Sequence, residues 1–320
     1  MKAIKLRQIE PEKDFPLLAE WFTLLERQVN TVPGLIKYFE ENKDLIFSQL
    51  AIDDMGNKLG FYWGSRNRFH PHNVFQYLYV DPAFRKKGVG TLLYEHMDAE
   101  SLKLACKEFK FNVPDDCPEG LSFMLHRGYI ETLHSINMEL DFKSFDDKPY
   151  QTIVEKLKED GFQFTTMEEL GNTEEAQHKL YTLNDTTAMD TPLWTGGHCW
   201  DTFEEFKKSV CDAQWYNPAG QKVVIDSATG EWVAMSAITH FEGNETAYNL
   251  FTGVDKRYRG RKLAQAVKGL ALCFARDELK VPGVRTNHNT FNEPMIAIDR
   301  KFGYMVLPGY FALEKKFSNF

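Results

Sequence analysis

The chain has 320 residues and a mass of 37.1 kDa, a length that predicts two domains of ordinary size. Hydrophobic residues make up 43% of it and charged residues 26%, a balance that excludes a disordered or fibrous protein. With 38 Lys and Arg against 46 Asp and Glu, the formal charge of −8 excludes a general nucleic-acid binder, but it leaves room for a local basic pocket that takes one phosphorylated ligand.

Neither the cysteines nor the apolar segments indicate an extracellular or membrane protein. The five cysteines are scattered and form no C-x-x-C pair, so neither a zinc site nor a disulfide framework is predicted. No stretch approaches the ~18 uninterrupted apolar residues of a membrane span, and the charged N-terminal residues do not resemble a signal peptide. We therefore expect a protein of the reducing cytoplasm, without a metal, membrane or nucleic-acid partner.

The first half alternates between segments with the period of a strand and segments with the period of a helix. In chain order these are a strand at 3–9, helices at 15–29 and from Pro33, strands at 45–52, 59–65 and 74–80, a helix at 88–107, a strand at 110–113, a short helix at 120–126 and two strands within 129–142. The polar, proline-containing segment that follows is typical of a linker, which we place at 145–150.

The second half repeats this order. Its segments are a helix at 152–160, a strand at 162–167, helices at 174–189 and 203–211, strands at 222–225, 231–240 and 246–254, a helix at 261–277, a strand at 284–286, a short helix at 293–302 and two closing strands. Gly88 and Gly260, each between a strand and a helix, lie 172 residues apart, which is too long a period for a solenoid. The sequence therefore predicts two copies of one α/β unit, at 1–144 and 151–320.

Two loops have the composition of an anion site. Each follows a strand, carries basic residues and places glycine before an amphipathic helix: V-D-P-A-F-R-K-K-G-V-G-T at 80–91 and T-G-V-D-K-R-Y-R-G-R-K-L-A at 252–264. The first turn of a helix has unpaired backbone N–H groups and a partial positive charge, and glycine lets a diphosphate approach them. The basic side chains of both loops would add Coulombic attraction.

A purely structural interpretation of these loops stays open, in which the glycines only permit tight turns and the basic side chains are solvated. Neither loop is a P-loop, because G-x-x-x-x-G-K-[ST] is absent, and G-V-G-T lacks the third glycine of a dinucleotide fingerprint. Two such loops at matching places in a duplicated chain favour the binding interpretation.

The first loop, Arg85-x-x-Gly88-x-Gly90, resembles the acetyl-CoA-binding signature [QR]-x-x-G-x-[GA] of the GNAT N-acetyltransferase superfamily. The second resembles it as Arg257-x-x-Gly260-x-Lys262, with lysine in place of the last small residue. Three further segments resemble tandem members of the superfamily, namely the D-x-P stretch at 190–192, the asparagine-rich N-x-x-M segment at 287–295 and the G-[FY] pair at 303–304. The resemblance implies an α/β (α+β) fold of two duplicated GNAT-like domains, each a mixed, largely antiparallel sheet flanked by helices.

The same resemblance implies acetyl-CoA as the co-substrate and no metal. In the first copy it assigns binding to Leu78, Tyr79, Val80, Arg85, Lys86, Lys87, Gly88, Val89, Gly90 and Thr91. In the second copy it assigns binding to Leu250, Phe251, Thr252, Arg257, Tyr258, Arg259, Gly260, Arg261, Lys262, Leu263, Asn289 and Asn292. Asn289 and Asn292 have helix capping as an alternative role.

The family's reaction transfers an acetyl group directly from a thioester to an amine, with backbone N–H groups before the loop stabilising the oxyanion. The candidate base is Glu245, one residue before the family's usual glutamate, with a solvated strand-edge carboxylate as the alternative. The tyrosine that often protonates the thiolate is replaced by Asp299 in the second copy and by Met124 in the first. Asp299 is the candidate acid if its pKa is raised, with a solvated helix carboxylate as the alternative; Tyr304 and Tyr310 are unranked substitutes.

These assignments predict an acetyl-CoA-dependent N-acetyltransferase that acts on the amine of a small molecule or peptide. The second copy is favoured as catalytic, because it carries the asparagine series and both candidate groups. The missing tyrosine favours an alternative, a CoA-binding or protein-interaction module that keeps the fold without the chemistry. The aromatic segment 194–200 is interpreted either as an acceptor loop or as domain-interface packing.

Overall fold

The structure is a computed structural model that describes residues 4–27, 29–42, 46–66, 73–104, 108–190, 200 and 202–316. The chain forms two compact units: unit 1 comprises Met1–His134 and Pro308–Phe320, and unit 2 comprises Ser135–Leu307. These units differ from the predicted domains 1–144 and 151–320. The chain after His134 already belongs to unit 2, and its last segment returns to unit 1. The predicted linker 145–150 lies within unit 2, where a helix begins at Lys148.

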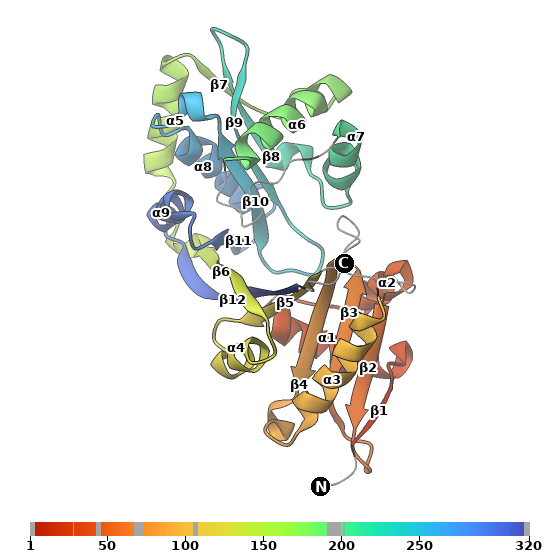
Figure 1. Cartoon of the computed structure of the whole chain (residues 1–320). Helices are drawn as coiled ribbons and strands as arrows, with labels where there is room; N and C mark the ends of the chain where they lie inside the picture. The colour runs from red at the N-terminus through yellow and green to blue at the C-terminus, as the bar shows by residue number, and fades with distance from the viewer. Residues whose placement is uncertain are drawn as a thin grey trace. The chain divides into compact units, whose positions relative to one another are not determined.

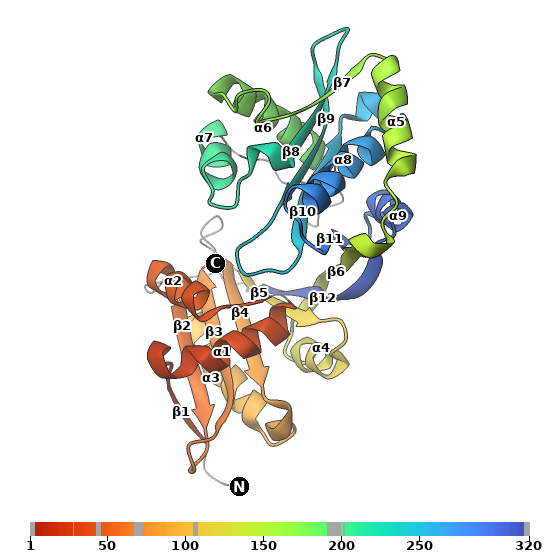
Figure 2. The same ribbon diagram turned by 180° about the vertical axis from the view of Figure 1, so that it is seen from behind.

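Unit 1 is a mixed sheet with helices on both faces (Figures 1 and 2). Its strand order is β1 (Lys5–Gln8), β2 (Ile46–Ile52), β3 (Lys58–Arg66), β4 (Asn73–Val80), β5 (Glu108–Pro114) and the end of β12 (Met305–Lys316). Only the β4–β5 pairing is parallel among those given for these strands. Helices α1 (Pro11–Glu26) and α2 (Val32–Asn42) pack on one face, and α3 (Val89–Leu102) and α4 (Pro118–Leu125) pack on the other.

Unit 2 repeats this arrangement. Its strand order is β7 (Phe162–Thr166), β8 (Gln221–Asp226), β9 (Trp232–Thr239), β10 (Ala247–Val254), β11 (Gly283–Asn289) and the end of β6 (Ile130–Asp141). Helices α6 (Glu174–Ala188) and α7 (Phe203–Phe206) cover one face, and α5 (Lys148–Glu159), α8 (Leu263–Asp277) and α9 (Glu293–Phe302) cover the other (Figures 1 and 2). The matching element order confirms the predicted duplication and fold class.

The last strand of each unit's sheet comes from the other half of the sequence. In unit 1, β12 at the end of the chain pairs with β5 from Tyr310 to Lys316. In unit 2, β6 pairs with β11 from Ser135 to Asp141. The prediction of two strands within 129–142 is wrong, because that segment has no Gly or Pro to turn the chain and forms one strand. The prediction of two closing strands is also wrong, because Met305–Lys316 forms one strand. Pro308-Gly309 does not end this strand; it lies where the chain leaves unit 2 and enters unit 1.

A buried carboxylate fixes the start of α1 on the edge of the unit 1 sheet. The Asp14 side chain is fully buried and accepts two bonds from the Arg7 guanidinium, at 2.7 and 2.8 Å. It also accepts a bond from the backbone N–H of Glu10 at 2.8 Å and pairs with Lys58 at 2.9 Å. Burial alone would raise the pKa of Asp14, but the bonds from Arg7 and Lys58 outweigh it and lower that pKa.

Replacement of Asp14 by Asn is expected to destabilise unit 1 by about 2 kcal/mol at pH 7, because charge-assisted hydrogen bonds are lost from a buried site. The folded-state pKa is lowered, so the charged group stabilises the fold above its unfolded pKa of ~3.9, and this contribution is lost as the pH falls. Urea unfolding from pH 7 to pH 3 tests this prediction. The gap between wild type and Asp14→Asn narrows below about pH 4; a gap that stays constant to pH 3 would contradict the assignment.

Candidate functional site

The middle of β10 is irregular, and its two neighbouring strands diverge there. The pairing of β10 with β9 shifts between Asn249 and Phe251, which makes Leu250 the extra residue of a β-bulge. The parallel pairing of β10 with β11 covers Ala247 and Tyr248 only. Beyond this point the strands splay, and side chains bridge them: the Thr286 hydroxyl donates to the carbonyl of Asn249 at 3.0 Å, and the Tyr248 hydroxyl donates to the Asn287 side chain at 2.9 Å. The bulge therefore lies at the vertex of an opening between two parallel strands.

Buried polar side chains stabilise the bulge. The Asn249 amide donates to the carbonyl of Ala237 at 2.9 Å, a backbone group of the facing strand, and also to the hydroxyl of Ser236 at 3.2 Å. Ser236 and Thr252 share a hydrogen bond at 2.9 Å. All three polar residues are buried. The sequence interpretation missed Asn249 and Ser236, although polar residues inside otherwise apolar strands were a signal for them.

The equivalent strand of unit 1 is regular. The pairing of β4 with β3 runs without a shift from Val74 to Val80. β4 also diverges from β5, after the pair of Gln76 with Phe111. Both units thus have an opening between parallel strands, but β10 has a bulge at its opening and β4 does not.

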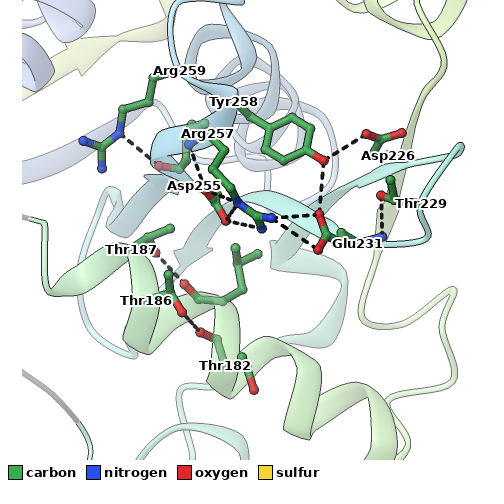
Figure 3. A network of polar contacts seen from close by, with 12 residues as sticks. Thr182, Thr186, Thr187, Asp226, Thr229, Glu231, Asp255, Arg257, Tyr258 and Arg259 are labelled. Atoms are coloured by element: carbon green, nitrogen blue, oxygen red, sulfur yellow. Dashed lines mark hydrogen bonds and ion pairs between the residues drawn. The ribbon is translucent and has the colours of Figure 1, made fainter.

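The loop between β10 and α8 has a defined backbone geometry (Figure 3). Asp255 accepts a bond from the backbone N–H of Arg257 at 2.9 Å and begins a short 3-10 turn. The Arg259 side chain donates to the carbonyl of Val254 at 3.1 Å. Gly260 has a φ of +80°, and Lys262, which begins α8 without a side-chain cap, has a φ of +65°. This geometry leaves the first N–H groups of α8 without a capping side chain.

The first loop has the same geometry at positions that correct the predicted alignment. The Arg85 side chain donates to the carbonyl of Val80 at 3.1 Å, Lys86 has a φ of +59° and Gly88 a φ of +83°. Arg85 is therefore equivalent to Arg259, Lys86 to Gly260 and Gly88 to Lys262. The predicted equivalence of Gly88 and Gly260 is off by two residues, because a lysine takes the left-handed position that glycine holds in unit 1.

The second copy of the loop motif is therefore Arg259-x-x-Lys262-x-Ala264, and the sequence interpretation missed Ala264. Arg257, the predicted first residue of the motif, has an anchoring role instead. Its guanidinium pairs with Asp255 at 2.8 Å and with Glu231 at 3.3 Å, and its hydrogen bond to Asp255 raises its pKa.

The remaining side chains of the second loop divide into anchors and exposed groups. Tyr258 is buried and donates to Asp226 and Glu231, at 3.0 and 3.2 Å (Figure 3). Arg261 and Lys262 are exposed, and among the described residues nothing beyond the two chain neighbours of Gly260 lies within 4 Å of the position that a Cβ on this residue would take. The backbone and basic side chains at 260–262 are therefore accessible to an anionic ligand.

Helix α6 lies close against β10, and a residue shortly after this helix forms a side-chain bond to the loop. A Cβ on Gly253 would lie 2.4 Å from the Thr187 hydroxyl, so glycine is required for the approach of the helix. Figure 3 shows Thr182, Thr186 and Thr187 of α6 below the loop. After α6, Asp190 accepts a bond from Arg259 at 2.9 Å, which gives a contact to the first residue of the predicted D-x-P stretch. Thr191, Pro192 and segment 194–199 lie outside the described residues.

The two candidate catalytic carboxylates are not brought together. Glu245 is exposed in the turn before β10 and does not lie on the strand. Asp299 is fully buried, with Lys268 and His288 as its ion-pair partners. Burial alone would raise its pKa, but the charge of Lys268 and the bond from His288 lower it. The prediction of Asp299 as an acid with a raised pKa is wrong, and so is the alternative of a solvated carboxylate.

The other predicted polar residues differ in their hydrogen bonds, in their burial and in the unit to which they belong. The Asn289 side chain accepts from the backbone N–H of Phe291 at 3.0 Å, whereas Asn292 begins α9 without a side-chain cap bond. Tyr304 is buried in unit 2, and burial raises its pKa well above the usual range. Tyr310 pairs with β5 in unit 1.

In unit 1, two side chains lie across the first turn of α3. The Phe123 ring is 3.6 Å from the position of a Cβ on Gly90, and the Arg127 guanidinium stacks on that ring, 3.4 Å from its centroid. Arg127 also donates to the Thr91 hydroxyl at 3.3 Å. At Gly88, apart from its two chain neighbours, nothing in the described part of the chain lies within 4 Å of the position that a Cβ would take.

Neither a membrane-spanning helix nor a metal-binding group of side chains is found in the part of the chain that the structure describes. There, none of the helices combines the length and the apolar character that a membrane crossing needs. Within the same residues, no three side chains of His, Cys, Asp or Glu are grouped in a way that would hold a metal ion.

Comparisons with known proteins show the same architecture. The sequence model of the Acetyltransferase (GNAT) family matches residues 9–118. No curated protein matches the chain by sequence. Among solved structures, the GCN5-related N-acetyltransferase from Sphaerobacter thermophilus is similar with a TM-score of 0.72 and 15% identity, over 98% of this chain and 95% of that one. A tandem GNAT protein from the clavulanic acid biosynthesis pathway is similar with a TM-score of 0.68 and 16% identity, over 98% of each chain.

A third similar structure is the GCN5-related glucosamine N-acetyltransferase region of a fungal multi-domain β-N-acetylglucosaminidase. Its TM-score is 0.69 and its identity 14%, over 98% of this chain and 38% of that one. At these identities the likeness to solved structures is one of fold, whereas the family match is one of sequence. Residues 9–118 therefore match the GNAT acetyltransferase family in sequence, and the chain as a whole has the fold of a tandem GNAT protein.

Proposed function

We propose that this protein is an acetyl-CoA-dependent N-acetyltransferase in which unit 2 carries out the reaction on the amine of a small molecule or peptide. The observation that carries this proposal is the β-bulge at Leu250, placed where β10 and β11 splay. It supports unit 2 over unit 1, because β4 has the same opening without the bulge. Free thiols at Cys117, Cys211 and Cys273 fit a reducing compartment such as the cytoplasm.

The loop before α8 would bind the diphosphate of the co-substrate. The backbone at Gly260 is open, and the two left-handed residues turn the chain so that the first N–H groups of α8 are uncapped. Such N–H groups, together with the exposed Arg261 and Lys262, suit a doubly charged anion. Asn292 has no cap bond to α9, so its amide is available to the pantetheine arm.

The bulge would serve the acyl group. A bulge interrupts the β-ladder locally and leaves its extra residue without a pairing partner, so the N–H groups around Leu250 can donate to the oxygen of the thioester. As the amine nitrogen attacks the carbonyl carbon, negative charge develops on that oxygen, and preorganised donors stabilise it there. The extended arm of CoA fits the splay, because an extended chain can run alongside unpaired strand edges.

We propose that unit 1 does not catalyse the reaction. Its β4 strand has no bulge, and the side chains of Phe123 and Arg127 lie across the first turn of α3. Its anion loop keeps the geometry of the second loop, so binding of CoA without turnover is the role that remains open to it.

The direct test is release of free CoA thiol from acetyl-CoA by the purified full chain, screened over amines, amino acids, antibiotics and peptides. Release that depends on both acetyl-CoA and one acceptor class supports the proposal. Saturable binding of acetyl-CoA with no release across the panel would contradict it and favour the CoA-binding module instead.

Deletion of Leu250 is expected to lower turnover by at least about 100-fold, because it restores the regular pairing of β10 and removes the oxyanion donors. Binding of acetyl-CoA should stay within about tenfold of wild type, since the loop at 259–264 is untouched. Steady-state thiol release and calorimetric titration check the two effects. Equal losses in binding and turnover would show that the bulge matters for folding or binding and not for the chemical step.

A further inference from the structure

Unit 2 contains a buried group of three titratable side chains that the proposed function does not use. Lys268 on α8 and Asp299 on α9 are both fully buried and form an ion pair. The Nε2 atom of His288 on β11 lies 2.7 Å from the second oxygen of Asp299. The His288 side chain itself is 9% exposed. Lys268 and Asp299 come from two helices packed on one face of the sheet, and His288 comes from β11, a strand of that sheet.

The fold does not need charges at these places, as unit 1 shows. α3 and α8 begin at Val89 and Leu263, so the equivalent of Lys268 is Tyr94. The backbone N–H of Tyr129 bonds to the carbonyl of Met124, as that of Tyr304 bonds to the carbonyl of Asp299, so Met124 is the equivalent of Asp299.

The strand pairings extend this comparison to the third residue. Val74 pairs with Phe109 in unit 1, as Ala247 pairs with Val284 in unit 2, so the equivalent of His288 four residues further along is Val113. Tyr94, Val113 and Met124 all lie in one hydrophobic core. Burial of an ion pair costs desolvation free energy that apolar side chains avoid. The charged set in unit 2 therefore calls for a reason other than stability.

His288 lies in the opening between β10 and β11. The last parallel pair is Tyr248 with Arg285, and His288 is three residues further along β11. Thr286, two residues earlier and therefore on the same face of the strand, bonds to the backbone of Asn249 across the opening. Continuing the parallel register places His288 opposite the residues just after the bulge, such as Thr252.

The imidazole is held at one nitrogen only. Asp299 accepts at Nε2, and Nδ1 has no hydrogen-bond partner among the described residues. The charged groups that face His288 are Asp299 from α9 and, behind it, Lys268 from α8. From β6 the paired residue is Ile136, which is apolar. The neighbouring β10 contributes Asn249 and Thr252, which carry no charge.

We infer that His288 is the general acid that protonates the leaving thiolate, and that Asp299, itself held by Lys268, is a positioning residue for its ring. The inference rests on the proposed function, which places the thioester carbonyl at the bulge and hence its sulfur across the opening, beside β11. As the C–S bond breaks, its electron pair stays on sulfur, and sulfur takes a proton from the imidazolium. The neutral imidazole then regains a proton from the amine nitrogen, which must lose one when the amide forms. The balance is one amine and one thioester converted to one amide and one thiol.

A measurement on the wild-type protein tests the position of the sulfur without turnover. The imidazole nitrogens are labelled with ¹⁵N, and the His288 signals are assigned by their loss in His288→Gln. Saturation with CoA should shift these signals, whereas desulfo-CoA, which lacks the thiol, should shift them by less than half as much. Equal shifts with the two ligands overturn the inference, as does the absence of any shift at saturation.

Kinetics test the proton transfer. We expect His288→Gln to lower kcat about 100-fold with the KM for acetyl-CoA within about threefold, and to remove the alkaline fall of kcat with pH. Asp299→Asn should lower kcat about tenfold with the KM for acetyl-CoA within about threefold, because the ring loses the carboxylate that accepts at Nε2. His240→Gln changes an exposed histidine of the same unit and should leave the profile unchanged. A kcat–pH profile of His288→Gln that keeps the wild-type shape overturns the inference.

The two readouts separate this inference from the proposed function. If CoA shifts the His288 signals and desulfo-CoA does not, but no amine is acetylated, the proposed function fails while the placement of His288 at the sulfur stands. If the wild type turns over and the two ligands act alike, only the inference fails. If neither ligand binds, both are overturned. Should His288→Gln fail to fold, the signals are assigned with His288→Asn, and the comparison of CoA with desulfo-CoA still decides.

Discussion

A chain that ends at Leu307 is expected to lose the fold of unit 1 while unit 2 stays folded. The removed segment holds the part of β12 that pairs with β5 over seven residues, Tyr310 to Lys316. Leu313 in this strand is fully buried in the core between the sheet and α3. The loss of this side chain alone is expected to lower the free energy of unfolding by about 2–5 kcal/mol, as a large-to-small substitution in a core does. Together with the loss of the strand pairing, this destabilisation approaches the 5–15 kcal/mol that is the usual free energy of unfolding of a whole domain.

Calorimetry and limited proteolysis of the full and shortened chains measure this effect. The shortened chain should lose the transition of unit 1 and be cleaved within residues 4–134, with unit 2 resistant. Leu313→Ala provides a graded variant, with an expected loss of about 2–5 kcal/mol in unit 1 alone. Lys316→Ala changes an exposed side chain of the same strand and should have almost no effect. A shortened chain with both transitions intact would contradict the assignment of β12 to unit 1.

Local patterns predicted most of the elements but not the exchange of strands between the halves. The alternation in 74–80 and the helical spacing in 174–189 depend on each element's own faces, and the structure has β4 and α6 there. The destination of 308–316 depends on which edge strand it pairs with. That is a non-local contact with Phe109 and its neighbours, and no pattern within the segment encodes it.

The candidate site was predictable to a similar extent. Glycine and basic residues located both loops, because they mark the turn itself. The predicted alignment of the two loops is wrong at Lys262. A lysine in a left-handed conformation is uncommon, and the local sequence does not predict this conformation. The prediction for Asp299 is wrong for a different reason. Its lowered pKa depends on Lys268 and His288, and these residues contact it only because α8, α9 and β11 pack together.

A charge reversal in the second loop is expected to weaken binding of acetyl-CoA by about 100-fold. Gly260→Glu places a carboxylate where the diphosphate would bind. At about 6 Å and an effective dielectric constant of about 20, one pair of like charges costs about 3 kcal/mol, which is about two decades in Kd. Gly260→Lys is the matched control, with a side chain of similar length and the same left-handed backbone. Unit 1 has Lys86 at the equivalent position with a φ of +59°, so a lysine is compatible with this turn.

The central claim is that main-chain N–H groups at the start of α8 hold the anionic end of the co-substrate, and calorimetric titration with acetyl-CoA tests it most directly. All proteins carry Gly88→Glu, so that the corresponding loop of unit 1 does not contribute. We predict one saturable site per chain when position 260 is Gly or Lys, with Kd values within about tenfold of each other, and a Kd about 100-fold weaker when it is Glu. Equal affinity of the Glu and Lys variants, with both folded by thermal unfolding, would contradict the claim.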